Sequence, residues 1–235
     1  MKKPTLDPQQ ILRQVEIFKA VSDNDIHTLA QIAIQRQVEE GSFFFHQGET
    51  AEYLYVLSEG RAKLSQLAED GEQVNLRTLL PYHLFGAVGA VDPSASYPAS
   101  AQALENCTAL AIRASEFKVL LEKNPRLAFG MMQLMTGYIQ EMQQRFRELA
   151  TERVEQRIAR TLVRLAAQTG TKIEQGIRID LSFSRQELAE MTGTTLFTVS
   201  RTLSTWERKG FLTSGREKIT ITDPHGLVRL AEGLK

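Results

Sequence analysis

Apolar side chains recur three or four positions apart between Ile11 and Arg36, the spacing of one face of an α-helix. Within this stretch Ser22, followed by Asp23 and Asp25, offers the side-chain oxygen that caps the N-terminus of a helix. We therefore predict helices over residues 11–36, the second of them starting directly after these capping residues.

The pattern changes between residues 38 and 113, where short β-favouring runs are separated by turns that contain glycine. The predicted strands are 42–46, 53–58, 62–68, 73–80, 99–104 and 108–112. Asp70-Gly71 is typical of the tight turn of a hairpin. Strands that repeat about every ten residues, each followed by a turn, predict an antiparallel barrel or sandwich.

A long amphipathic helix is predicted from Pro125 to about Ala150, after a short helix over 115–122 that Ser115 would cap. Its apolar positions, again three or four apart, are Leu127, Met131, Leu134, Tyr138, Met142, Phe146 and Leu149. About 25 residues span about 37 Å at 1.5 Å per residue, which is more than a small domain needs. Two interpretations stay open: the helix packs on its own barrel, or two such helices pair in a dimer.

Residues 184–212 contain two short helical runs that meet at a Thr-Gly-Thr segment. Ser184 and Glu187 have the spacing of a capping box, so a helix is predicted to begin at Arg185. Gly193 permits a tight turn, after which one of the next two threonines can cap a second helix. Two helices joined in this way form a helix-turn-helix. An amphipathic helix and a strand pair precede it, and a β-hairpin turning at Gly215 follows it.

The second of these helices is predicted to have one buried and one exposed face. The residues expected to be buried are Leu196, Val199, Leu203 and Trp206. Those expected to point outward are Phe197, Thr198, Ser200, Arg201, Ser204, Thr205 and Arg208. Hydroxyl groups and arginine are the side chains that bond to base edges and phosphates, so the exposed face suits DNA. An ordinary helical hairpin with solvated hydroxyls is the alternative.

Charge is unevenly distributed although the formal net charge is zero. Residues 1–150 hold 14 Lys and Arg against 18 Asp and Glu, whereas residues 151–235 hold 14 against 10. An acidic front part and a basic rear part suggest two modules, the second of which can approach a polyanion.

Composition excludes several classes of protein. Cys107 is the single cysteine, so one chain cannot contain an internal disulfide, a CxxC pair or an all-cysteine metal site. No run approaches the roughly 18 apolar residues of a membrane helix, and no apolar stretch follows the two N-terminal lysines as in a signal peptide. We expect a cytoplasmic protein without a membrane partner. Because no nucleophile elbow, P-loop, HExxH or paired metal motif occurs, we do not expect an enzyme.

Three stretches carry a family resemblance: EEGSFFFHQGETAEYLYVLSEGRAKL, the long helix after Pro125, and SRQELAEMTGTTLFTVSRTLSTWERKGFL. Over nearly its full length the chain resembles the cyclic-AMP receptor / fumarate–nitrate reductase regulator (CRP/FNR) superfamily of bacterial transcription factors. The resemblance implies an α+β fold: an N-terminal antiparallel β-roll, similar to cupin and cyclic-nucleotide-binding domains, a long dimerisation helix and a C-terminal winged helix-turn-helix.

The resemblance also implies an organisation and a set of partners. Residues 1–124 would sense an effector, 125–150 would form the homodimer, and 151–235 would bind double-stranded DNA. A near-palindromic site and contact with RNA polymerase are expected, and the dimer interpretation of the long helix is favoured.

The resemblance assigns DNA-binding residues position by position. The set is Arg185, Gln186, Thr194, Thr195, Leu196, Phe197, Thr198, Ser200 and Arg201. Arg185 and Gln186 match positions that contact the DNA backbone, and Arg201 matches a nearly constant arginine that is expected to contact guanine. Phe197 stands where many members carry a glutamate that accepts a hydrogen bond from cytosine. Phenylalanine packs on a thymine methyl instead, so we predict an A·T pair there; Leu196 is also apolar, so DNA shape is expected to contribute.

The resemblance leads us to expect an effector other than the usual cyclic nucleotide. Members that bind one carry a Gly-Glu-Leu cassette and a later Arg-Ser, which hold ribose and phosphate. Here Ala87 replaces that glutamate, and no arginine lies between Arg77 and Arg113. The single cysteine excludes the iron–sulfur cluster of the oxygen-sensing branch. The predicted effector pocket comprises Phe85, Gly86, Ala87, Val88, Tyr97, Ala99, Ser100, Met135 and Tyr138.

Three kinds of control stay open: haem that detects nitric oxide or carbon monoxide, a small organic ligand, or no ligand. Haem needs only one or two axial ligands, and His83, just before the cassette-like loop, is the candidate. The ordinary interpretation of each of the four histidines is a surface or hydrogen-bonded side chain.

Overall fold

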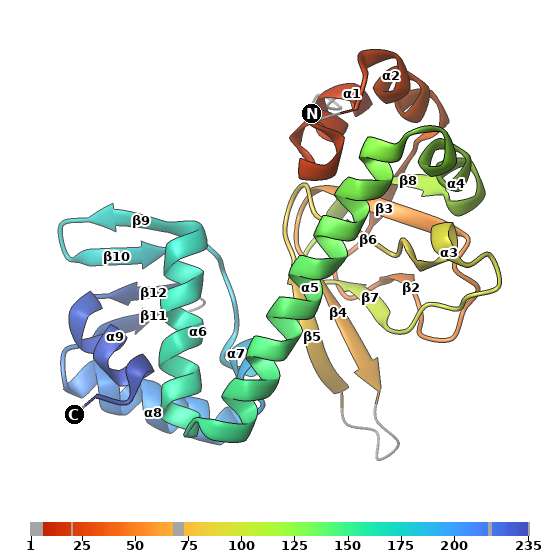
Figure 1. The fold of residues 1–235 in the computed structure, drawn as a ribbon. Helices are drawn as coiled ribbons and strands as arrows, with labels where there is room; N and C mark the ends of the chain where they lie inside the picture. The colour runs from red at the N-terminus through yellow and green to blue at the C-terminus, as the bar shows by residue number, and fades with distance from the viewer. Residues whose placement is uncertain (1–6, 20, 68–72, 216–217, 235) are drawn as a thin grey trace. The chain divides into compact units, whose positions relative to one another are not determined.

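The computed structural model describes residues 7–19, 21–67, 73–215 and 218–234 (Figure 1). The chain divides into two compact units, Met1–Gln140 and Glu141–Lys235, and the boundary lies inside helix α5 (Pro125–Thr151). The division into three functional parts, 1–124, 125–150 and 151–235, therefore stays a prediction about roles. Among the described residues no helix is both long and apolar enough to cross a membrane.

The first unit begins with two short helices and a 3₁₀ turn: α1 (Pro8–Gln14), η1 (Glu16–Phe18) and α2 (Asp23–Ile32). Ser22 caps α2 as predicted, because its hydroxyl accepts a hydrogen bond from the Asp25 amide at 3.2 Å. The prediction of helix up to Arg36 is wrong. Strand β1 (Ile34–Val38) begins there and pairs with a strand more than 60 residues away, so tertiary pairing overrides the local helical spacing.

Two antiparallel four-stranded sheets form the body of the first unit. The remaining strands are β2 (Phe43–Phe45), β3 (Tyr53–Glu59), β4 (Ala62–Leu67), β5 (Gln73–Leu79), β6 (Leu84–Phe85), β7 (Ser100–Ala103) and β8 (Cys107–Arg113). The sheet orders are β1-β8-β3-β6 and β2-β7-β4-β5. All six predicted strands are confirmed, and β1 and β6 were not predicted. Asp70-Gly71 lies outside the described residues, but the strands on either side of it, β4 and β5, pair antiparallel.

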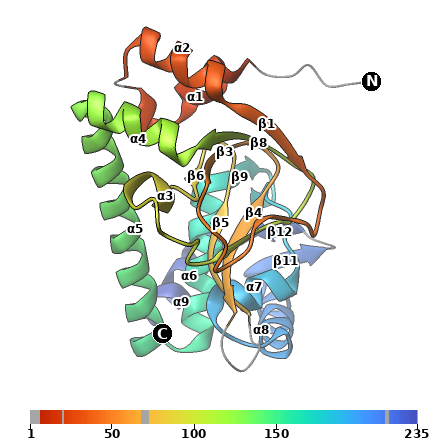
Figure 2. The same ribbon diagram turned by 90° about the vertical axis from the view of Figure 1, so that its right-hand side faces the viewer.

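Helices cover one end of these sheets, where α1, α2 and α4 (Ala114–Lys123) gather in both views (Figures 1 and 2). A single apolar core joins them to β3, β8 and the start of α5, and Phe18 meets Phe117 in it edge to face at 6.1 Å. Helix α4 starts at Ala114, whose amide bonds to the Glu52 carbonyl at 2.8 Å. Ser115 therefore lies inside the helix, and our prediction that it caps the helix is wrong. A further short helix, α3 (Val88–Val91), belongs to the cassette-like loop.

The second unit continues with α6 (Val154–Thr169), β9 (Gly170–Ile173), β10 (Gly176–Ile179), α7 (Arg185–Thr192), α8 (Leu196–Arg208), β11 (Leu212–Gly215), β12 (Lys218–Ile221) and α9 (Pro224–Glu232). Its sheet has the order β11-β12-β10-β9. The predicted hairpin is confirmed as β11 and β12, although residues 216–217 at its turn are not described. Helix α9, which was not predicted, is capped by Asp223 and packs on α6.

Candidate DNA-binding interface

The first helix of the two-helix motif begins where the capping box places it. The Glu187 amide donates to the Ser184 hydroxyl at 3.0 Å, and the Ser184 amide donates to Glu187 Oε2 at 2.7 Å. This reciprocal pair satisfies two amides that helix α7 would otherwise leave without partners. The start of α7, and with it Arg185, is therefore held by local chemistry.

The turn between α7 and α8 depends on Gly193. Its φ of +59° lies in the left-handed region, and a Cβ at this position would lie 2.8 Å from Leu149 Cδ2. Thr195, rather than Thr194, caps α8, because its hydroxyl accepts from the Thr198 amide at 3.2 Å. Glycine is thus required both by the backbone and by the close approach of α5.

Arg157 of α6 also holds this turn, and the sequence did not predict it. Its guanidinium donates to the Thr192 carbonyl at 3.0 Å and to the Gly193 carbonyl at 3.2 Å. These carbonyls end α7 and have no partner inside the helix. A cation at the C-terminus of a helix is favourable as well. Arg157 and Thr192 are 35 positions apart in the sequence, so no local pattern predicts this contact.

Helix α8 has the two faces that the pattern predicts, with one exception. Val199, Leu203 and Trp206 are buried, whereas Phe197 is 73% exposed. Leu196, predicted to be buried, is 46% exposed. Leu196 is the first residue of α8, and the buried residues of the helix begin one turn later, at Val199. Helical spacing does not show where along a helix burial begins.

Two exposed side chains of α8 form a pair. The guanidinium carbon of Arg201 lies 5.8 Å from the centre of the Phe197 ring, one helical turn away. This is the distance of a cation–π contact, which costs little to break at an exposed site. Arg201 is therefore presented outward beside an apolar ring.

Some of the predicted hydroxyl and amide donors are engaged within the motif. The hydroxyls of Thr195 and Thr198 bond to each other at 3.0 Å, and the Thr205 hydroxyl donates to the Arg201 carbonyl at 2.9 Å. Gln186 donates to Glu190 at 3.3 Å. Because these bonds are exposed, they can exchange for contacts to DNA at low cost.

The hairpin β11–β12 is joined to both helices by a polar network that the sequence did not predict. Glu207 of α8 accepts from the amide and the hydroxyl of Ser214, at 2.7 and 2.5 Å. Arg185 of α7 donates to the same hydroxyl at 3.1 Å. The contact joins residues up to 29 positions apart, so it places the hairpin and Arg185 side by side only in the folded chain.

Helix α5 carries two apolar faces, which the sequence pattern had combined. Leu127 is fully buried and Met131 nearly so, in the core of the first unit, and Leu134 packs against that core. Tyr138 donates to the Leu84 carbonyl at 3.1 Å, and the guanidinium of Arg77 lies 3.9 Å from its ring centre. These four positions of the predicted dimer stripe therefore face their own unit, as the first of the two interpretations expects.

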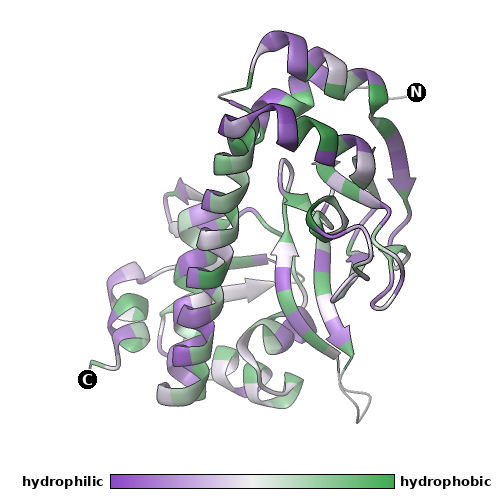
Figure 3. Cartoon of the chain, turned by 45° about the vertical axis from the view of Figure 1, so that its right-hand side comes forward, coloured by the Kyte–Doolittle hydropathy of each residue, from purple (hydrophilic) through white to green (hydrophobic). Residues whose placement is uncertain are grey.

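The exposed apolar residues of α5 follow another line. The first of them is Phe129, which is 57% exposed. The six that follow are Met132, Met135, Ile139, Met142, Phe146 and Leu149, each at least half exposed. Their spacing alternates strictly between three and four residues, which is a heptad repeat. The stripe predicted from the sequence departs from a heptad repeat because it combined residues of the buried face with residues of the exposed face. Hydrophobic residues recur along the helix in Figure 3. We call these six residues the α5 stripe.

Two residues of the predicted effector pocket, Phe85 and Tyr97, lie among aromatic side chains. Phe85 and Tyr97 are buried and contact Phe44, Phe45 and Tyr55 between the two sheets. The rings of Phe45 and Tyr97 stack at 3.7 Å, and those of Tyr55 and Phe85 stack at 5.3 Å. These five rings, which we call the aromatic cluster, pack against one another.

The aromatic cluster also anchors the loop. The Tyr97 hydroxyl donates to the Tyr53 carbonyl at 2.6 Å and accepts from the Tyr53 amide at 3.1 Å. Burial raises the pKa of the Tyr97 hydroxyl well above its ordinary value, so it stays protonated. Gly86, with a φ of +74°, lets the backbone pass close to the Phe45 and Tyr97 rings.

The other predicted pocket residues are not gathered at one point. Ala87 and Val88 are half-buried and pack on different cores, Ala99 is buried, and the Ser100 hydroxyl accepts from the Gln47 amide at 2.9 Å. Met135 belongs to the exposed α5 stripe. An effector pocket made of these nine residues therefore stays a prediction.

His83 does not have the geometry of a haem ligand. Its Nδ1 accepts a hydrogen bond from the Leu80 amide at 3.2 Å. In a neutral imidazole the proton is then on Nε2, whereas an Nε2 ligand must be unprotonated and usually donates from Nδ1 to a carbonyl or carboxylate. The described residues also include no group of three or more His, Cys, Asp or Glu side chains that could hold a metal ion.

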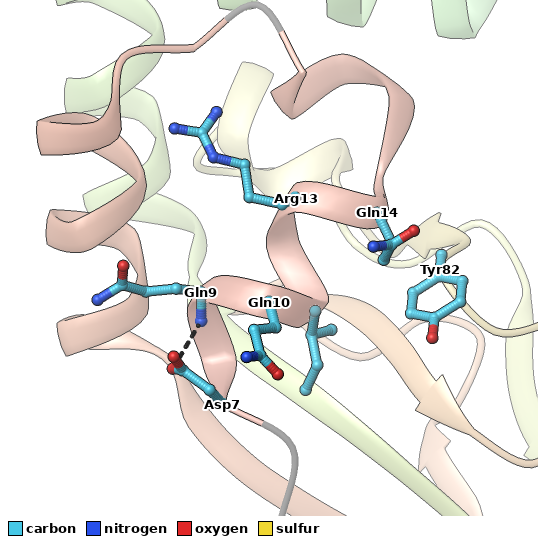
Figure 4. A pocket seen from close by; sticks show the side chains of 7 residues that line it. Asp7, Gln9, Gln10, Arg13, Gln14 and Tyr82 are labelled. Carbon is cyan, nitrogen blue, oxygen red and sulfur yellow. Dashed lines mark hydrogen bonds between the residues drawn. The ribbon is translucent and has the colours of Figure 1, made fainter.

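A polar groove of about 470 Å³ lies elsewhere in the first unit (Figure 4). Its lining residues are Asp7, Gln9, Gln10, Ile11, Arg13, Gln14 and Tyr82. The Arg13 guanidinium is engaged within the protein: it donates to the carbonyls of Phe18 and Val21 and pairs with Asp23. None of the predicted pocket residues lines this groove.

Comparisons with known proteins agree with this architecture. The Crp-like helix-turn-helix domain matches residues 156–230, and the cyclic nucleotide-binding domain matches residues 35–124. The transcriptional activator protein Anr of Pseudomonas protegens is 30% identical over 198 residues, which cover 84% of this chain and 80% of that protein. The global nitrogen regulator of Synechococcus elongatus is 30% identical over 194 residues, covering 81% and 86%.

Solved structures share the fold. A mutant of CooA from Carboxydothermus hydrogenoformans matches with a TM-score of 0.77 at 20% identity, over 95% of this chain and 99% of that one. FixK2 from Bradyrhizobium japonicum matches with a TM-score of 0.75 at 22% identity, over 85% and 97%. The relatives with shared sequence are transcription regulators and not enzymes. This chain therefore belongs to the CRP/FNR superfamily of transcription regulators, with a cyclic-nucleotide-binding-like domain in front and a Crp-like DNA-binding domain behind.

Proposed function

We propose that this regulator binds a near-palindromic DNA site as a homodimer and reads the bases with helix α8. The observation behind the proposal is the exposed pair of Phe197 and Arg201 on a helix whose N-terminus is capped by Thr195, next to an anchored hairpin. Two such helices related by a two-fold axis would enter successive major grooves about 34 Å apart. In this proposal Arg185 and Gln186, at the start of α7, contact the phosphates beside the groove that α8 enters.

The α5 stripe supplies the dimer contact in this proposal. Six apolar side chains in strict heptad register are exposed on a helix of 27 residues. Such a stripe is the sequence of a two-stranded coiled coil, whose seam buries it. RNA polymerase is the expected further partner of the DNA-bound dimer, as in the family that this chain resembles.

The regulator is proposed to respond to an effector other than cyclic AMP, and not to an iron–sulfur cluster. Ala87 stands where a ribose-binding glutamate is needed, and Cys107 alone cannot hold a cluster. Haem does not fit at His83, whose Nδ1 accepts from an amide. Control without any ligand is the second candidate, because Phe85 and Tyr97 of the predicted pocket already pack in the aromatic cluster.

Selection of binding sites from random DNA tests this function. The selection is run without ligand and again with added ligands, and in at least one case the full-length protein should enrich two half-sites one helical turn apart, about 10 base pairs, each with a guanine. Arg201→Ala should abolish the preference for that guanine, whereas Arg208→Ala, at the far end of α8, should leave it intact. Failure to enrich any sequence would contradict DNA reading. Enrichment that appears only after a ligand is added would contradict the ligand-free alternative.

A further inference from the structure

Phe197 is the most exposed aromatic side chain on the reading face of α8. A single exposed apolar residue is common on protein surfaces and needs no explanation by itself. This one lies in the first turn of the helix, however, where Thr195 and Arg185 frame the face proposed to meet DNA. Its surroundings therefore indicate what it would touch.

A phenyl ring selects one chemical group in the major groove. It has no donor or acceptor, so it cannot read the hydrogen-bonding pattern of a base pair. The apolar group that B-DNA displays there is the C5 methyl of thymine. C5-methylated cytosine carries the same methyl on the same carbon of the pyrimidine ring, whereas cytosine and uracil lack it.

The position of Arg201 indicates the neighbouring base. Its guanidinium carbon lies 5.8 Å from the ring centre of Phe197, and successive bases along a strand are 3.4 Å apart. With the ring on a methyl group, the guanidinium reaches the adjacent base pair, where its two nitrogens match guanine O6 and N7. The weak contact between the ring and the cation favours an arrangement in which both side chains lie side by side before DNA binds.

We propose that Phe197 and Arg201 together read a 5-methylpyrimidine next to a guanine, and that the methyl group, not the base that carries it, is recognised. This inference rests on the proposed DNA-binding function. It implies that C5 methylation of a cytosine at this position strengthens binding, so that the target site responds to the methylation state of the DNA.

Modified oligonucleotides test the inference directly. In the selected site each thymine is replaced in turn by deoxyuridine, which removes only the methyl group. At one position in each half-site the affinity of the full-length protein should fall about fourfold, and about fifteenfold when both half-sites are changed, as expected for one methyl group returned to water. With cytosine at that position, 5-methylcytosine should bind about fourfold more tightly than cytosine.

Two variants assign the effect to its residue. In Phe197→Ala the thymine and deoxyuridine sites should bind equally, and the helix should stay folded because the side chain is exposed and alanine favours helix. Leu196→Ala removes the neighbouring exposed apolar side chain; whatever its effect on overall affinity, it should keep the full difference between the thymine and deoxyuridine sites. An effect that persists in Phe197→Ala, or disappears in Leu196→Ala alone, would assign the methyl contact to another residue and overturn the inference.

The pairing with Arg201 has its own test. Replacement of guanine by 7-deazaguanine removes N7, and the position at which this weakens the wild type but not Arg201→Ala marks the guanine that Arg201 reads. That position should be directly adjacent to the methyl-sensitive one; a larger separation would overturn the inference. If every thymine tolerates deoxyuridine while the unmodified site binds well, the inference is wrong and the proposed function stands. If the wild type binds no DNA, both fail.

Discussion

Cys107 is a residue whose chemistry is set by its burial. The thiol is 3% exposed and donates to the Arg61 carbonyl at 3.1 Å. Burial, with a smaller contribution from the nearby Glu105 carboxylate, raises the pKa of the thiol from 9.0 to about 11. The folded protein therefore keeps this proton in a range of pH where the unfolded chain has lost it.

We expect this difference to appear as an alkaline loss of stability. The contribution of the thiol is fully present below about pH 9 and is lost as the pH rises toward 11. Between pH 8 and 10 the free energy of unfolding of the first unit should fall by about 1 kcal/mol more in the wild type than in Cys107→Ala. All five tyrosines lie in the first unit and the single tryptophan in the second, so near-ultraviolet tyrosine dichroism follows the correct transition in urea.

The same measurement contains its control. Tyr55 and Tyr97 also have raised pKa values, but both variants carry them, so their effect cancels in the difference. Equal pH dependence of the wild type and Cys107→Ala would contradict the assignment. So would rapid alkylation of the folded protein at pH 8, because the thiolate is the reactive form.

At the scale of a single element, α5 combines two tasks on two faces. One face packs against the roll through Leu127, Met131 and Tyr138, and the other carries the α5 stripe. A helix that were only packed on its own domain would need no second apolar face, and a polar one would keep it in solution. The heptad spacing of the exposed side chains is the reason to expect a second helix against it.

Ile139 lies in the middle of the α5 stripe, and Ile139→Glu should make the protein monomeric. An unpaired carboxylate in the seam costs several kcal/mol, so we expect the dimer dissociation constant to rise at least about 100-fold. Sedimentation velocity at micromolar protein measures this. Gln140→Glu is the matched control, since it adds the same charge to an exposed position about 100° further around the helix. A dimer that survives Ile139→Glu would place the contact elsewhere.

For the molecule as a whole, charge asymmetry sets the behaviour toward DNA. The chain has no net charge, yet residues 151–235 carry an excess of four positive charges. Attraction to DNA therefore depends on which part of the protein faces it, and each phosphate contact that is made displaces counterions. The affinity of the dimer should fall steeply with salt.

Arg185 should account for a defined part of that salt dependence. One phosphate contact contributes about 0.9 to the slope of the logarithm of affinity against the logarithm of salt concentration. Arg185→Ala, which acts twice in a dimer, should therefore reduce the slope by about 2 while the selected sequence stays the same. Fluorescence anisotropy between 50 and 300 mM salt, about the range in which such slopes are measured, would show this. Arg126→Ala, in the other unit, should leave the slope unchanged; a changed sequence preference in Arg185→Ala would mean that Arg185 reads bases.

Local signals in the sequence were enough to predict much of this architecture. The capping box at Ser184, the glycine of the turn at Gly193 and the alternation of six strands each depend on residues a few positions apart. The errors occur where distant partners decide. Residues 34–38 have helical spacing but form a strand that pairs with β8. Leu196 has the spacing of a buried residue, but its side chain is exposed at the first position of α8. The polar network of Arg185, Glu207 and Ser214 has no local signature at all.

By itself the sequence determined the family, the two-helix motif and the residues on its outer face, because capping, turn chemistry and helical spacing act within one or two turns of chain. Only the tertiary structure decided which apolar face of α5 stays exposed and that five aromatic rings pack together in the roll. It alone also showed that the exposed side chains of Phe197 and Arg201 contact each other, with the guanidinium carbon 5.8 Å from the ring centre. Burial depends on what the rest of the chain brings alongside a residue, and the pattern of that residue's own segment does not contain this information.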